Sequence, residues 1–110
     1  MGYYADGSGY ITLNPLNAKQ LERVDEIFKD SIFEYDITSS QNETNIDVWC
    51  SDKYRDYWVE PCLRDLVPLG VLAGEIQFAG EDHCFWRFIY KGNRGSGQWL
   101  EQGGHIVYDE

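Results

Sequence analysis

The spacing of apolar residues changes along this chain from every second residue to every third or fourth, and then back again. Side chains alternate between the two faces of a strand, whereas a helix brings residues three and four positions apart onto one face. From Ala18 onward the apolar residues follow the helical spacing, at Leu21, Val24, Ile27 and Phe28. This segment therefore predicts a helix with one buried stripe.

The residues before this helix predict how it begins. Asn17 followed by Gln20 is the pattern of an N-cap with its capping-box partner. Ahead of it, Tyr10 to Leu13 predicts a short strand, and Asn14-Pro15 ends it. Gly7 and Gly9 are expected to loosen the segment in front of that strand.

The middle of the chain predicts a hairpin and a second helix. Apolar and polar residues alternate around Tyr35 and again around Val48, with a polar, turn-rich stretch over 39–45 between them. A helix is then expected over 54–66, with Pro61 near its first turn or at a kink, and with Pro68 and Gly70 ending it. Its inward side chains are expected to be Trp58, Cys62, Leu63 and Leu66.

The last third predicts strands over 75–78, 84–90, 98–101 and 106–108, with a turn over 80–82 and a flexible tip over 92–97. The strand over 84–90 is apolar on both faces, which favours a central position. The order predicts one α+β domain over 1–110. We expect a ferredoxin-like β-α-β-β-α-β arrangement with additional C-terminal antiparallel strands and with both helices on one face of the sheet.

The net charge of the chain limits the classes of molecule that it is expected to bind. The chain has 19 acidic and 9 basic residues, a net charge of −10, and the excess is spread over both halves. Such a surface repels phosphate and anionic lipid and attracts basic proteins. Ferredoxin-like domains that bind RNA surround their strand aromatics with bases, so direct nucleic-acid binding is disfavoured. No signal peptide or membrane-spanning run is visible, and an odd number of cysteines favours a reducing compartment, so we expect a cytoplasmic protein.

Candidate catalytic groups are few. His83 and Cys84 are neighbours on an expected strand and should point to opposite faces, although Cys84 could meet His105 across strands. Cys50, Cys62 and Cys84 lack the short paired spacing of zinc ligands. The loop over 92–97 resembles a phosphate cradle, but a strand follows it rather than a helix. We therefore expect no enzyme activity, no metal and no cofactor, while a thiol or carboxylate enzyme stays an open alternative.

Two acidic patches are the candidate binding sites. If the helices cover one face of the sheet, the hairpin presents its outward residues on the other face, where regularly spaced carboxylates could imitate a phosphate backbone beside an aromatic anchor. The alternative interpretation is an acidic face that is merely solvated. The outward residues of the hairpin patch are Glu34, Asp36, Thr38, Asp47 and Trp49, and the second patch, on the first helix, is Glu22, Asp25, Glu26 and Asp30. Glu75, on a later strand, is a further acid that we expect to point outward.

The second half of the chain also carries a resemblance. The run Gly74-Glu-Ile-Gln-Phe-Ala-Gly-Glu-Asp82, then Trp86-Arg-Phe, a Gly-rich hairpin and a final Ile-Val-Tyr, resembles small orphan proteins of phages and mobile elements. In size and acidity the chain also resembles anti-CRISPR proteins.

That resemblance implies a phage-encoded inhibitor, acting in the bacterial cytoplasm, that blocks a basic channel or surface of a CRISPR effector as a nucleic-acid mimic. The alternatives are a non-inhibitory regulatory module and an immunity protein for a basic toxin. The protein could be a monomer, or a homodimer through exposed aromatics such as Trp49 or Trp99.

Overall fold

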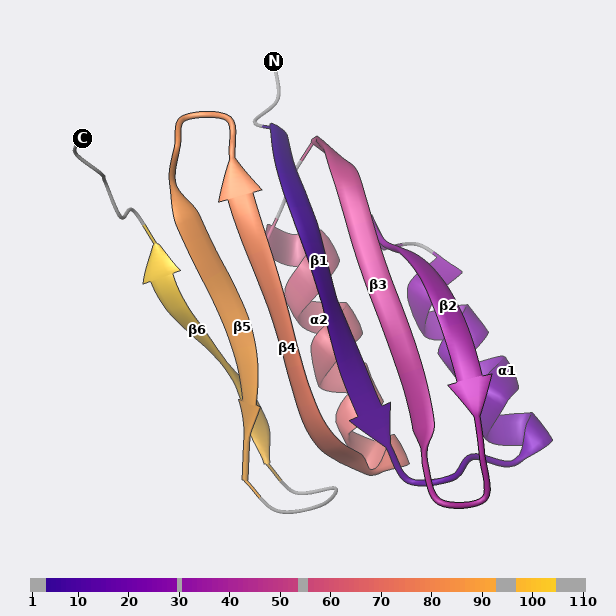
Figure 1. Ribbon diagram of the computed structural model, residues 1–110. Helices are drawn as coiled ribbons and strands as arrows, with labels where there is room; N and C mark the ends of the chain where they lie inside the picture. The colour runs from indigo at the N-terminus through magenta and orange to yellow at the C-terminus, as the bar shows by residue number, and fades with distance from the viewer. Residues whose placement is uncertain (1–3, 30, 54–55, 93–96, 105–110) are drawn as a thin grey trace.

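Two helical segments lie between strands in the first part of the chain, and only strands follow them (Figure 1). The computed structural model describes residues 4–29, 31–53, 56–92 and 97–104. Within them the elements are β1 (Tyr4–Leu13), α1 (Ala18–Lys29), β2 (Glu34–Ser39), β3 (Thr44–Lys53), α2 (Asp56–Leu66), the short 3-10 helix η1 (Val67–Leu69), β4 (Val71–Gly80), β5 (Phe85–Lys91) and β6 (Gln98–Gly104).

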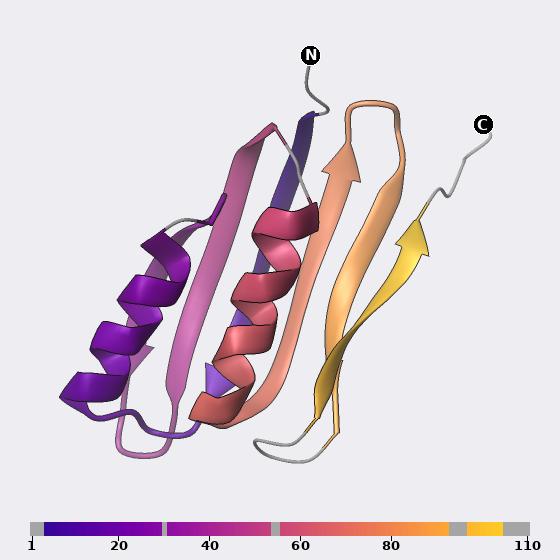
Figure 2. The same cartoon turned by 180° about the vertical axis from the view of Figure 1, so that it is seen from behind.

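The described strands form one antiparallel sheet in the order β2-β3-β1-β4-β5-β6. β3 separates β1 from β2, and β1 separates β3 from β4, so the two strand-helix-strand units interleave. Both helices lie on the same side of the sheet, and the other side is uncovered (Figures 1 and 2). The expected α+β class with both helices on one face is therefore confirmed. Neither helix among the described residues is long and apolar enough to cross a bilayer.

The N-terminus of α1 forms the capping box that the sequence predicts. The backbone N–H of Gln20 donates to Asn17 Oδ1 at 2.8 Å, and the backbone N–H of Asn17 donates to Gln20 Oε1 at 3.0 Å. These two bonds satisfy donors that the helix itself leaves without partners. The stripe is confirmed at Val24, Ile27 and Phe28, which are buried. Leu21, the first residue of the expected stripe, is only half-buried.

β1 is much longer than the sequence predicted, since it begins at Tyr4 rather than Tyr10. The expectation that Gly7 and Gly9 loosen this segment was wrong. A Cβ at Gly9 would stand 2.1 Å from the backbone oxygen of Glu75 on β4, and one at Gly7 would stand 2.5 Å from the Phe78 ring. The glycines therefore permit close packing inside the strand instead of interrupting it.

α2 contains Pro61 in its interior, beyond the first turn, and the proline removes one helical N–H donor there. Val59, Cys62, Leu63 and Leu66 are buried, while the side chain of Trp58 lies outside the described part of the chain. As predicted, the helical segment ends through Pro68 in η1 and through Gly70, which has a positive φ of 95°.

Aromatic rings fill the core between β4, β5 and the helices. Phe78 stacks on Trp86 with ring centroids 5.4 Å apart, and meets Phe88 edge to face at 5.9 Å. Phe33 reaches the same cluster, 6.1 Å from Phe78. Offset and edge-on pairs of this kind contribute beyond the area they bury. The aromatic residues thus give a short chain a substantial core.

The C-terminal strands differ from the prediction in detail. β5 has strand neighbours on both sides, β4 and β6, but only one of its faces is covered, and Phe85 on the open face is 49% exposed. His83 and Cys84 precede β5 in a turn, with His83 at φ 65°, so they are not strand neighbours. The expected strand over 106–108, His105 and most of the expected flexible tip lie outside the described residues.

Candidate partner-binding surface

The uncovered side of the sheet, here called the open face, holds the first acidic patch. Glu34 and Asp36 on β2 and Asp47 on β3 are all exposed there. The alternating burial of β2 and β3 places Tyr35 and Val48 on the opposite, helix-covered side. The structure therefore brings the three predicted hairpin acids onto one surface.

The strand register fixes how these groups face one another. Asp36 lies directly opposite Asp47, and Glu34 lies directly opposite Trp49. Residues opposite each other on one face have Cβ atoms about 5 Å apart, and alternate residues along a strand are about 6.8 Å apart. The hairpin thus presents negative charges at short, regular intervals around one exposed indole.

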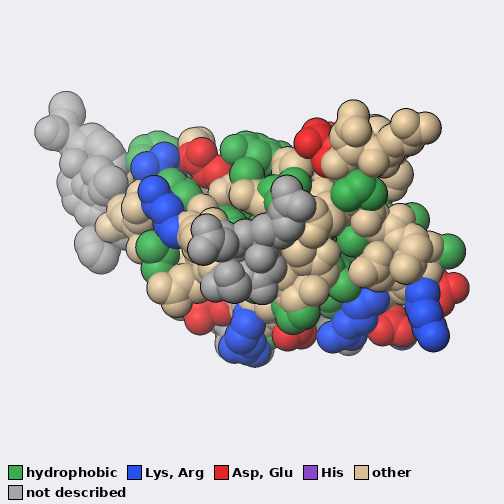
Figure 3. Space-filling model, turned by 90° about the horizontal axis from the view of Figure 1, so that it is seen from below, with side chains coloured by type: hydrophobic (Ala, Val, Ile, Leu, Met, Phe, Trp, Pro, Cys, Tyr) green, Lys and Arg blue, Asp and Glu red, His purple; other side chains and the backbone are tan. Residues whose placement is uncertain are grey.

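Basic side chains are distributed elsewhere. Among the described residues, Glu34, Asp36 and Asp47 have no ion pair with a base. Figure 3 shows the molecule from the end at which the hairpin of β2 and β3 turns. Lys and Arg lie at the left-hand end and along the lower side, over the helices, where Asp and Glu lie as well, while the rest of the upper side shows acidic, apolar and polar groups. The bases with described side chains are Lys19, Arg23 and Lys29 on α1, Arg64 on α2, and Arg87 and Lys91 on β5.

On the part of the open face formed by β4 and β5, the acidic residue Glu75 is paired with a base. Arg87 donates to Glu75 Oε2 at 2.9 Å, and also donates to Gln102 on β6. Hydrogen bonds from Gln77 and from Arg87 lower the pKa of the Glu75 carboxyl. Glu75 therefore does not add to the unpaired acidic surface, although the sequence placed it among the outward acids.

The second candidate patch, on α1, lies on the opposite side of the molecule and is partly engaged. Asp25 Oδ1 accepts a hydrogen bond of 2.6 Å from the hydroxyl of Tyr35, and this bond raises the pKa of Tyr35. Glu26 pairs with Arg23 at 3.3 Å. Glu22 is exposed, and Asp30 lies outside the described residues. The two patches cannot act as one surface, because the sheet separates them.

Sequence reasoning missed most of the aromatic content of the open face. The exposed large apolar residues on the described strands all lie on this side, and only Trp49 was singled out from the sequence. Counting Gly7 and Gly9 as the small, inward residues of an alternating strand would have revealed Tyr4 and Tyr10. Their exposed fractions are 49% for Tyr4, 44% for Tyr10, 41% for Trp49, 49% for Phe85 and 36% for Leu100.

The pKa values of the Cys62 and Cys84 thiols are both raised. Burial, with a contribution from Asp65, raises the pKa of Cys62 to about 12. Desolvation and the Asp82 carboxylate raise the pKa of the Cys84 thiol, so the nucleophilic thiolate is disfavoured at neutral pH. Cys50, Cys62 and Cys84 form no disulfide, and the described residues contain no group of three or more His, Cys, Asp or Glu placed to hold a metal ion.

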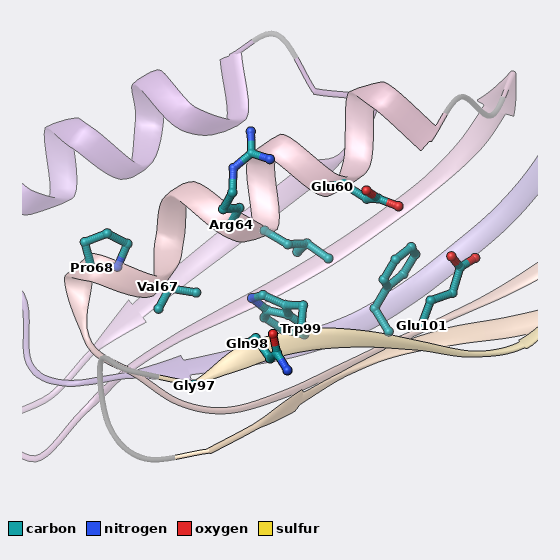
Figure 4. Close-up of a pocket in the computed structure, with 10 residues that line it drawn as sticks. Glu60, Arg64, Val67, Pro68, Gly97, Gln98, Trp99 and Glu101 are labelled. Carbon is teal, nitrogen blue, oxygen red and sulfur yellow. The ribbon is translucent and has the colours of Figure 1, made fainter.

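A groove of about 520 Å³ lies between α2 and β6 (Figure 4). Leu63, Val67 and Trp99 form apolar walls, and Glu60, Arg64 and Glu101 bring charges of both signs. The indole nitrogen of Trp99 has no hydrogen-bond partner among the described residues, but it is itself buried.

No protein-family model, curated protein or solved structure matches this chain. The geometry of the open face is therefore the feature of the molecule from which we infer a function.

Proposed function

We propose that this chain is an inhibitory binding protein whose open face occupies a basic, nucleic-acid-binding surface of another protein. The observation that carries the proposal is the set of three exposed hairpin carboxylates, Glu34, Asp36 and Asp47, without a paired base among the described residues. Carboxylates at short intervals on a rigid strand pair are complementary to a surface built to hold phosphates.

The biological setting that we propose is inhibition of a CRISPR effector by a phage-encoded protein. Such effectors hold their guide–target duplex in a positively charged channel and contact its backbone rather than its sequence. An acidic protein that enters this channel competes with nucleic acid without any catalytic step. Long-range attraction would speed association and would weaken as salt is raised.

The test uses a panel of purified CRISPR effectors loaded with guide RNA. We expect one of them to form a stable complex with the protein and to lose binding of its target DNA. Neutralising the hairpin in the triple variant Glu34→Gln, Asp36→Asn, Asp47→Asn should weaken the complex at least about a hundredfold, since close interfacial charge pairs each contribute roughly 1.5 kcal/mol or more.

The matched control removes the same charge from the helix side, in the triple variant Glu22→Gln, Glu26→Gln, Glu60→Gln. These acids are exposed and lie on α1 and α2. The control should bind nearly as well as the unaltered protein. Equal losses in both triple variants would contradict a defined binding face, and failure to bind any effector in the panel would contradict the proposed setting.

We also propose that the first four strands and the two helices belong to the ferredoxin-like arrangement. Two interleaved strand-helix-strand units in the order β2-β3-β1-β4 support this assignment. In that description β5 and β6 are an extension that widens the open face beyond β4.

A further inference from the structure

Trp49 is an exposed aromatic residue with acidic residues at two neighbouring positions of the sheet. It lies on β3 opposite Glu34 on β2 and opposite Ser8 on β1, with Asp47 two residues earlier on its own strand. Its side chain is 41% exposed. A large aromatic surface is thus accessible to a partner, with carboxylates on two sides and only a short side chain on a third.

The ring face of tryptophan attracts cations, and the attraction is larger for a flat guanidinium that stacks on it than for a compact, strongly hydrated ammonium. A carboxylate next to the ring adds two parallel hydrogen bonds that only the guanidinium fork can make. We propose that the open face recognises arginine, with a partner's guanidinium stacked on Trp49 and paired with Glu34. This inference rests on the proposed function and names the chemistry of the partner surface.

The open face has a second exposed aromatic ring next to carboxylates, further along the same strands. Tyr10 on β1 is 44% exposed and lies directly opposite Asp47, which itself lies opposite Asp36. An aromatic ring again stands beside carboxylates without a paired base. Trp49 and Asp47 are about 6.8 Å apart along β3. The matching partner surface therefore presents arginines in a cluster rather than singly.

A second copy of this chain fits the surface less well. Each copy brings a net charge of −10. The bases on the described part of the open face are Arg87 and Lys91, and Arg87 already bonds Glu75 and Gln102. Face-to-face pairing would also bring two sets of hairpin acids into one interface. Charge complementarity thus favours a cationic partner over a homodimer.

The test titrates the protein with oligo-arginine and with oligo-lysine peptides of equal length at low salt, and measures both dissociation constants by calorimetry. We expect oligo-arginine to bind about threefold tighter or more, because the cation–aromatic contact is worth that much at a partly exposed site. Trp49→Leu should lower this preference to the part that the Glu34 carboxylate contributes, and should leave oligo-lysine binding nearly unchanged. Trp49→Phe should lower the preference less.

Phe85→Leu is the matched control, since Phe85 is an exposed ring on the same face, on β5, away from the hairpin acids. It should leave the arginine preference intact. Thermal unfolding of each variant checks that it folds.

The outcomes separate the two proposals. Equal binding of both peptides, lost in the hairpin triple variant, would overturn arginine recognition and leave the proposed function standing. No binding of either peptide, or binding that the triple variant does not weaken, would overturn both. A concentration-dependent dimer in sedimentation equilibrium, abolished by Trp49→Leu, would also overturn arginine recognition, because a second copy would then occupy the surface.

Discussion

At the scale of single residues, the acidic side chains that would bind a cationic partner destabilise the hairpin that carries them. Asp36 and Asp47 lie directly opposite each other, and like charges in this position destabilise an antiparallel pair. A base or a threonine at either position would relieve the repulsion. The protein keeps both carboxylates at a site where they do not help the sheet to form.

We expect Asp47→Asn to raise the free energy of unfolding by about 0.5 kcal/mol at low salt, because it removes this cross-strand repulsion. Urea unfolding monitored by circular dichroism measures the change. Glu34→Gln is the control: it removes the same charge from a residue that lies opposite Trp49, so its effect should be smaller. High salt should reduce the gain by screening. A loss of stability in Asp47→Asn would contradict the interpretation.

Cys62 provides a second residue-scale prediction. Its thiol is buried on α2, and its pKa of about 12 keeps it protonated at neutral pH. Iodoacetamide should therefore leave Cys62 unmodified in the folded protein and should alkylate it rapidly in concentrated urea. Mass spectrometry of peptides from both reactions gives the measurement. Fast alkylation in the native state would mean that α2 does not protect the thiol as described.

At the scale of elements, the sequence predicted what local interactions determine. The capping box of Asn17 and Gln20, the stripe of α1 and the stop at Gly70 each depend on residues a few positions apart. The extent of β1 was missed because its glycines make sense only against Phe78 and Glu75, more than sixty positions later. A local pattern does not contain that contact.

The packing of β6 against the rest of the sheet also depends on a contact between residues that are far apart in the sequence. Trp99 on β6 reaches across Tyr90, whose ring centroid is 5.6 Å away, to Gly74 on β4, where a Cβ would come within 2.4 Å of the indole. Gly74→Ala should therefore displace Trp99 and lower the free energy of unfolding by roughly 1–3 kcal/mol, as overpacked sites do.

A double-mutant cycle checks this contact. In a Trp99→Leu background, Gly74→Ala should cost clearly less than in the unaltered protein, because the ring that it meets is gone. Equal costs in the two backgrounds would show that the indole does not lie over Gly74.

At the scale of the whole molecule, the two sides of the sheet differ in how acidic and basic side chains are distributed. The helix side carries acids and bases together, the β4–β5 half of the open face pairs Glu75 with Arg87, and the hairpin half carries acids without a paired base among the described residues. The sequence predicted the hairpin acids because strand alternation alone assigns them to one face. It did not predict the pairing of Glu75 or the exposure of Tyr10, since both depend on which strands become neighbours.

The central claim is that the open face, and not the helix side with its mixture of acids and bases, receives a cationic partner. Two-dimensional ¹⁵N–¹H correlation spectra, recorded while an oligo-arginine peptide is added, test it most directly. The account predicts shifts at Glu34, Asp36, Asp47 and the indole N–H of Trp49, with the exposed residues of α1 nearly unmoved. Shifts concentrated on α1, or spread evenly over all exposed acids, would contradict it.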